Sequence, residues 1–266
     1  MKLTAFSIVF LLVLVLVSPV FGAWEDALEN LKEKALGGDG RAEEVLAEIY
    51  LTGEGVPRDD GEARYWAEMA AEQGRPRSQN ILATFFAAGA AGRVDQAEAV
   101  RWWTLASEQG HAEAQYHLGL RYARGEGVPA DSRKAQHWLE KSAVQGTPAA
   151  QYALGVMFEF GTGIEVNSQE AAKWYAKAAQ AGLAIAQENL GLMYARGKGV
   201  PQDLLKAYFW TRLAADQGRL HARRQLQELG EAMTGGQKAE AGRALEIWQV
   251  CREGAPAFCN IDWETR

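Results

Sequence analysis

The segment AQYHLGLRYARGEGVPADSRKAQHWLEKSAVQG, residues 114–146, contains one copy of an internal repeat. A tryptophan recurs every 36 residues, and a glycine, a leucine and an alanine keep the same period over five copies. The tryptophans are Trp66, Trp102, Trp138, Trp174 and Trp210. A fixed period of this length predicts an array of similar supersecondary units that stack on one another.

The first half of the repeat predicts a helix. Leu118 and Tyr122 lie on one stripe of that helix. Gly119 shares the stripe and costs the helix about 1 kcal/mol relative to alanine, so its recurrence predicts the close approach of another helix backbone. Gly125 ends the helix, and Pro129 prevents its continuation.

The second half of the repeat predicts a second helix. Asp131 is placed to cap its N-terminus, because its side chain can accept hydrogen bonds from the free N–H groups of the first turn. Ala135, Trp138 and Leu139 then form an apolar stripe, and Gly146 ends the helix. The expected caps of the other copies are Asp59, Asp95, Asn167 and Asp203.

The two helices are joined by a loop with two glycines, ARGEGVP at 123–129, which returns as ARGKGVP at 195–201. Phosphate-binding loops are also rich in glycine, but they follow a strand and end in Gly-Lys-Ser or Gly-Lys-Thr. Here a proline and a capping residue follow instead, so the loop is predicted to connect antiparallel helices. In the second repeat the loop at 87–95 lacks the Val-Pro pair, which predicts a looser turn.

The first 22 residues predict a secretory signal peptide. Lys2 supplies a positive start, residues 8–17 are an unbroken apolar run, and compact residues lead to a cleavage site after Gly22. That run is too short to span a bilayer of ~30 Å stably, so we expect no stable membrane span after cleavage. A retained N-terminal anchor is the alternative. The predicted location is the periplasm, with secretion as the alternative.

The net charge limits which partners are expected, and the cysteine content indicates the redox environment. The formal net charge is −6, and it becomes −7 without residues 1–22, which hold one lysine and no acid. This balance argues against nucleic acid and anionic membranes as partners. Cys251 and Cys259 are the two cysteines. In an oxidising compartment they are predicted to form a disulfide, and their spacing suits neither a metal site nor a Cys-x-x-Cys redox pair.

The pattern predicts the following organisation. A signal peptide at 1–22 is followed by a single helix at 23–40, by five repeats, by capping helices at 221–250 and by a tail at 251–266. The repeats are expected at 41–76, 77–112, 113–148, 149–184 and 185–220.

The segment 114–146 resembles Sel-1-like repeats, relatives of the tetratricopeptide repeat, and MTGGQKAEAGRALEIW at 233–248 is similar to the end helix of many bacterial members. The resemblance covers nearly all of the mature chain. It implies an all-α fold, namely an α/α right-handed superhelical solenoid of tetratricopeptide-like helix pairs. It also implies an adaptor or scaffold for other proteins, with no chemistry of its own.

Sequence motifs of enzymes are not found. The chain contains no Ser-x-x-Lys, Gly-x-Ser-x-Gly or His-Glu-x-x-His, and its four histidines share no metal-ligand spacing. We therefore expect no catalytic residue, no cofactor and no metal. A β-lactamase-like hydrolase, as described for cysteine-rich relatives with a cysteine pair in each repeat, is a remote alternative. An accessory factor that binds peptidoglycan or another glycan is a second one.

The repeated tryptophans could bind sugars, but their place on the apolar stripe favours packing. Trp103 lies outside that register and is expected to be partly exposed.

The predicted binding site lies on a further face of the first helices, which the resemblance assigns to a concave groove. Aromatic, aliphatic and arginine side chains there suit a protein or peptide partner from the envelope or a secreted one. The alternative is that some of them pack against the next repeat. The sequence specifies neither the partner nor the oligomeric state. The predicted residues are Tyr116, Leu120, Arg124, Tyr152, Val156, Phe160, Leu192 and Arg196.

Overall fold

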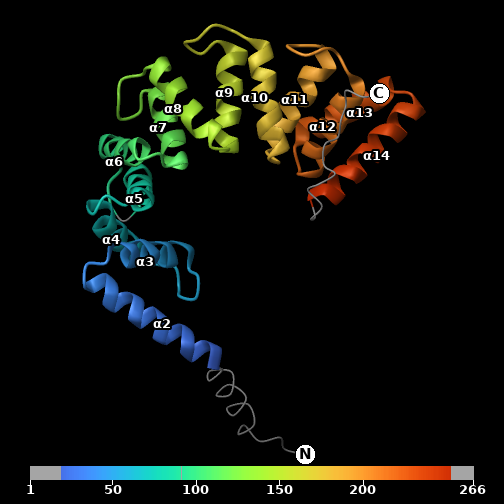
Figure 1. Cartoon of the computed structure of the whole chain (residues 1–266). Coiled ribbons are helices and arrows are strands. Elements are labelled where there is room, and N and C mark those ends of the chain that lie inside the picture. The colour runs from blue at the N-terminus through green and yellow to red at the C-terminus, as the bar shows by residue number, and fades with distance from the viewer. Residues whose placement is uncertain (1–18, 91, 253–266) are drawn as a thin grey trace, which may run out of the picture. The chain divides into compact units, whose positions relative to one another are not determined.

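In the computed structural model, residues 19–90 and 92–252 are described, and they form thirteen helices and no strand (Figure 1). Most helices follow one another as antiparallel pairs, as the two-helix repeat predicts. The helices are α2 (Pro19–Leu36), α3 (Gly40–Thr52), α4 (Asp60–Glu72), α5 (Pro76–Ala88), α6 (Gln96–Glu108), α7 (Ala112–Arg124), α8 (Ser132–Val144), α9 (Pro148–Phe160), α10 (Ser168–Gln180), α11 (Ala184–Arg196), α12 (Leu204–Asp216), α13 (Leu220–Ala232) and α14 (Gly235–Arg252).

The chain divides into two compact units. The N-terminal unit comprises the residues up to 121 together with 125–129, and the C-terminal unit comprises 122–124 with everything from 130 onward. Helices α2 to α7 therefore belong to the N-terminal unit, apart from the last three residues of α7. Helices α8 to α14 belong to the C-terminal unit.

The helix ends follow the predicted chemistry. All five predicted caps accept backbone N–H groups of the first turn of their helices. At the other end, Gly125 terminates α7 in the left-handed conformation with φ of 69°, and Gly127 has φ of 76°. Because side chains with a Cβ rarely adopt these angles, the glycines make the turn between two helices possible. The loop is the predicted connector.

A row of glutamines ties each repeat to the one before it. Their side-chain amides donate to carbonyl oxygens near the C-terminus of the preceding second helix, groups that have no partner within the helix itself. A buried bond of this kind contributes about 1 kcal/mol net. The pairs are Gln79 with Ala71 at 3.2 Å, Gln115 with Ser107 at 3.0 Å, Gln151 with Ala143 at 3.1 Å and Gln187 with Ala179 at 3.1 Å.

The register tryptophans pack on the second helices. Trp66, Trp102 and Trp210 are buried. Trp138 and Trp174 are half-buried, and each carries the ammonium group of a lysine over its ring, at 4.7 Å and 4.0 Å from the centroid. Packing thus accounts for all five positions.

The expectation that Trp103 is partly exposed is wrong. Its side chain is 1% exposed, stacks on His117 at 5.0 Å and donates its indole N–H to Asn80 Oδ1 at 3.1 Å. Trp103 thus contacts the first helix of its own repeat through Asn80 and that of the next repeat through His117. The equivalent Tyr175 likewise bonds to the first helix of its own repeat, at Glu159.

The recurring mid-helix glycine marks a close approach, as predicted. A Cβ added to Gly191 would lie 3.2 Å from the carbonyl oxygen of Ala207, on the backbone of α12. At Gly155 the neighbour is a side chain instead, because a Cβ there would lie 2.5 Å from the ring of Tyr175. The glycine at 155 therefore leaves room for the ring of Tyr175.

Both ends of the array carry an extra helix. α2 already includes Pro19, the first described residue, so it runs through the predicted cleavage site after Gly22. The Trp24 indole N–H donates to the Gly55 carbonyl at 3.2 Å. At the other end α14 packs on α12, with Trp248 edge-on to Phe209.

Some predictions fall on residues outside the described part of the chain. The apolar run of the predicted signal peptide lies there, and so does Cys259. Cys251 lies in the last turn of α14 and is not a free thiol, while its pairing with Cys259 stays a prediction. None of the described helices is both long and apolar enough to cross a membrane.

Candidate functional site

The eight predicted site residues lie on three first helices. Tyr116 and Leu120 are on the part of α7 in the N-terminal unit, and the other six belong to the C-terminal unit. We call the positions that repeat with Tyr116, Leu120 and Arg124 the first-helix face. Because these positions recur with the 36-residue period, the face can be compared between the units.

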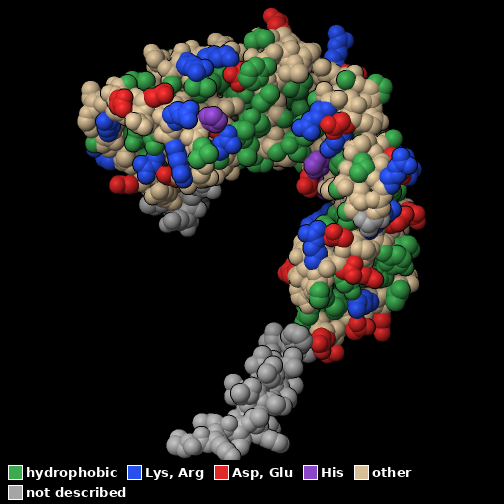
Figure 2. All heavy atoms as spheres, turned by 180° about the vertical axis from the view of Figure 1, so that it is seen from behind, with side chains coloured by type: hydrophobic (Ala, Val, Ile, Leu, Met, Phe, Trp, Pro, Cys, Tyr) green, Lys and Arg blue, Asp and Glu red, His purple; other side chains and the backbone are tan. Residues whose placement is uncertain are grey.

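In the C-terminal unit this face is apolar on α9. On α11 it is mixed, because Glu188 accepts from Arg219 at 2.6 Å, as Glu44 accepts from Arg75 in the N-terminal unit. Tyr152 and Val156 of α9 are half-buried and pack against the core, and Leu192 of α11 is also half-buried. Phe160 is 67% exposed at the end of α9, and Arg196 is exposed at the end of α11. Figure 2 shows hydrophobic side chains gathered over this unit next to lysines and arginines. The face thus offers apolar surface with cations at its edge.

Hydrogen bonds among Tyr175, Glu159 and Lys198 hold the side chains next to this face in place. The Tyr175 hydroxyl donates to Glu159 Oε2 at 2.7 Å, and Lys198 Nζ donates to Glu159 Oε1 at 2.9 Å. The ammonium group of Lys198 also lies 5.7 Å from the centroid of the Phe160 ring. Burial raises the pKa of Tyr175 and, to a smaller extent, that of Tyr152, whose rings are 5.6 Å apart. Both phenols therefore stay neutral at pH 7 and act as apolar packing groups.

In the N-terminal unit the same positions are mostly polar and are paired within the chain. Glu44 accepts from Arg75 at 2.9 Å, and Glu48 contacts Arg77. Asn80 donates to Glu113 Oε2 at 3.1 Å while its carbonyl oxygen accepts from the indole of Trp103. Glu48 and Asn80 thus contact the neighbouring repeat.

Two histidines take structural roles on α7. His111 caps the helix, because its Nδ1 accepts the N–H of Ala114 at 3.2 Å. His117 stacks on Trp103, and the Arg121 guanidinium lies 5.1 Å from the centroid of the same indole. Burial lowers the pKa of both histidines. Sequence reasoning missed the His111 cap because histidine is not among the preferred capping residues.

Metal ions in proteins are held by clusters of His, Cys, Asp or Glu side chains. No group of three or more of these side chains in the described part of the chain is placed to hold a metal ion.

The repeated helix pairs, the shared capping chemistry and the glutamine row define an all-α helical-repeat solenoid. A family model for the Sel1 repeat matches residues 41–74, 76–111, 112–146, 148–183 and 184–218, which is more than half of the chain. The chain therefore belongs to the Sel1 repeat family. Proteins of this family generally mediate protein–protein interactions and are typically non-catalytic. Among curated proteins, no sequence matches the chain.

Solved structures of this class are similar to the chain. One is a protective antigen of uropathogenic Escherichia coli strains with an SLR fold; it is 34% identical, with a TM-score of 0.74, and the match covers 85% of this chain and 51% of that one. The chain thus spans about half the length of that relative. A Sel1 repeat protein from Oxalobacter formigenes is 28% identical with a TM-score of 0.65, covering 71% of this chain and 75% of that one.

Proposed function

We propose that the protein is an exported scaffold that binds an apolar segment of an envelope or secreted protein on the first-helix face of its C-terminal unit. The observation that carries the proposal is the run of Tyr152, Val156 and Phe160 along α9, continued by Leu192 on α11. The family's general role in protein–protein interaction supports a protein as the partner.

The residues of this face differ in burial, and this indicates which of them hold the surface in place and which can contact a partner. Tyr152 and Val156 pack on the core, so they shape the surface and hold it rigid. Phe160 is two-thirds exposed, and an aromatic side chain supplies a large contact area on binding. Lys198 borders Phe160, and Arg196 is exposed at the end of α11; these cations favour a partner with acidic residues beside its apolar segment.

Export is the second part of the proposal. It rests on the predicted signal peptide at 1–22 and on the predicted disulfide, which suits an oxidising compartment. Fractionation of the producing cells with an antibody against residues 23–266 tests it. Recovery of a shortened chain from the periplasm or medium supports export, and a full-length chain in the cytosol contradicts it.

The binding proposal is tested with two matched variants. Residues 23–266 are immobilised and offered an envelope extract under mild cross-linking. Phe160→Asp places a charge on the proposed face, whereas Val144→Asp places one on α8 at a valine that is 78% exposed and lies outside the face. We expect a protein retained by the wild type and by Val144→Asp and lost by Phe160→Asp. Equal retention by all three contradicts the assigned face.

A further inference from the structure

The loops between paired helices share an aliphatic residue that the second repeat lacks. At the same position of the other four repeats this residue is half-buried, and Val200 packs against the core. In the second repeat the position is Gly92. The four aliphatic residues are Val56, Val128, Ile164 and Val200.

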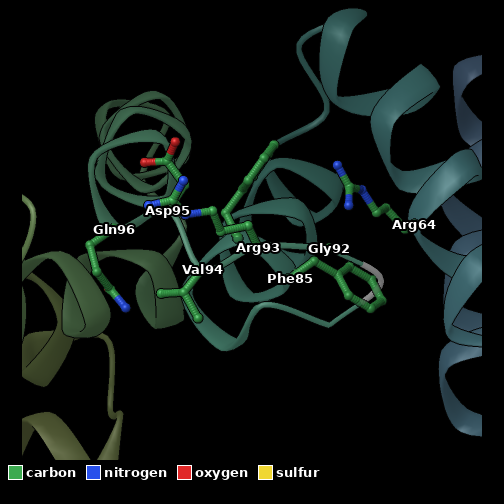
Figure 3. Close-up of a pocket in the computed structure, with 8 residues that line it drawn as sticks. Arg64, Phe85, Gly92, Arg93, Val94, Asp95 and Gln96 are labelled. Atoms are coloured by element: carbon green, nitrogen blue, oxygen red, sulfur yellow. The ribbon is translucent and has the colours of Figure 1, made fainter.

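A hollow lies where that side chain is missing. It has a volume of about 480 Å³ and lies between α4 and the loop of the second repeat, within the N-terminal unit. Figure 3 shows Arg64 reaching from α4 toward the loop that carries Gly92. A Cβ added to Gly92 would lie 3.1 Å from Arg64 Nη1, so the glycine and the guanidinium are close neighbours. The volume falls in the range of pockets that bind small ligands.

The walls of the hollow combine apolar surface with positive charge. Phe85 and Phe86 supply aromatic surface, and the Arg64 guanidinium lies 5.1 Å from the centroid of the Phe86 ring. Arg93 is exposed at the rim. The carboxylate in the lining belongs to Asp95, which already accepts the N–H of Glu98 at 3.0 Å as the cap of α6. Two cations against one carboxylate leave the hollow net positive.

We propose that this hollow binds the C-terminal end of a partner polypeptide whose last residue is aliphatic. The aliphatic side chain would occupy the space that valine or isoleucine fills in the other repeats. The terminal carboxylate would lie against Arg64 and Arg93, because guanidinium groups form strong charge-assisted hydrogen bonds with carboxylates. This site uses none of the residues proposed for the first-helix face, so the two proposals stand or fall separately.

The test is a titration followed by amide chemical shifts of Gly92 and Val94. N-acetyl-leucine carries both features of the proposed ligand, N-acetyl-leucinamide lacks the charge, and N-acetylglycine lacks the side chain. We expect saturable shifts with N-acetyl-leucine and affinity weaker by about tenfold or more for the amide, since a hydrogen bond to a charged group is worth roughly 1.5–3 kcal/mol. N-acetylglycine is expected to give no saturable shift.

Gly92→Val provides the matched variant, because it restores the residue that three other repeats carry. Gly92 does not have a positive φ, and its nearest contact is the end of a flexible arginine, so the variant is expected to fold. We expect it to abolish the N-acetyl-leucine shifts and to leave the circular dichroism spectrum unchanged. Arg64→Met with Arg93→Gln should remove the preference for the acid over the amide. Equal affinity for acid and amide, binding retained in Gly92→Val, or no shift with any compound overturns the proposal.

Discussion

The two units present the same face of the same helix pair, yet they use it differently. In the N-terminal unit, Glu44 and Asn80 are engaged by Arg75 and Glu113 of neighbouring segments. In the C-terminal unit Arg219 engages Glu188 in the same way, but α9 carries Tyr152 and Phe160 at these positions, and the phenylalanine is mostly exposed. Helix caps, turn glycines and the glutamine row hold the helix pairs together in both units. The residues on the first-helix face are not needed for this, so they can differ between repeats.

The largest loss of stability is expected when the buried aromatic side chain between paired helices is removed. Trp103 and Tyr175 occupy the same repeat position and are 1% and 0% exposed. Trp103→Ala and Tyr175→Ala should each lower the free energy of unfolding by about 3–5 kcal/mol, because each leaves a cavity. Urea denaturation followed by circular dichroism measures this. A loss well below 1 kcal/mol in either variant would show that the faces do not depend on these aromatic supports.

Removing a glutamine of the row is expected to lower the free energy of unfolding by a smaller amount, and by the same amount in both units. Gln79→Ala and Gln187→Ala each remove two side-chain hydrogen bonds, one to a carbonyl oxygen and one from the amide of Gln109 or Gln217. Each carbonyl keeps a backbone N–H partner, so two bonds of about 0.5–1.5 kcal/mol each are lost. Gln180→Ala changes an exposed glutamine at the end of α10, and it should cost less than about 0.5 kcal/mol. Denaturation midpoints of the three variants give the comparison. A large difference between Gln79→Ala and Gln187→Ala would contradict a common scaffold.

Acid should weaken the N-terminal unit through His111 and His117. Burial lowers both pKa values, so the unfolded chain binds more protons than the folded one as the pH falls below about 6.5, and the free energy of unfolding decreases. This stability is fully present above that pH. Denaturation at pH 7.5 and 5.5 should show the loss, and His111→Asn with His117→Phe should reduce it.

The carboxyl of Glu48 affects the free energy of unfolding in the opposite direction to the histidines, because it stabilises the folded chain when it is protonated. Burial raises its pKa, so its contribution is complete below about pH 4.5 and is lost as the pH rises through its folded pKa. A comparison of the double histidine variant with the parent at the same two pH values separates the groups. An unchanged pH dependence in the variant would exclude the histidines as its cause.

The smallest effect on stability is expected at Phe160. Because the side chain is 67% exposed, Phe160→Ala should change the free energy of unfolding by no more than about 0.5 kcal/mol. Partner capture should nevertheless fall. A large destabilisation would instead make Phe160 a packing residue.

The sequence predicted the helix pairs and their caps because those depend on local chemistry that repeats with the period. Asp131 and Gly125 each act within a few residues of their position. The burial of Trp103 was not predicted, since it depends on Asn80 of the paired helix and on His117 of the next repeat. The polar pairing of Glu44 was missed for the same reason. The repeat period shows which residues are equivalent, but it does not show which residues of other helices they contact.

The most direct test of the central claim uses a photo-cross-linking residue at position 160 and, in a separate variant, at position 52. Thr52 is the equivalent exposed position of the first repeat, in the N-terminal unit. After illumination with an envelope extract, we predict a discrete protein adduct from position 160 and none from position 52. Equal adducts from both positions, or an adduct from position 52 alone, would contradict the claim that the C-terminal unit carries the partner-binding face.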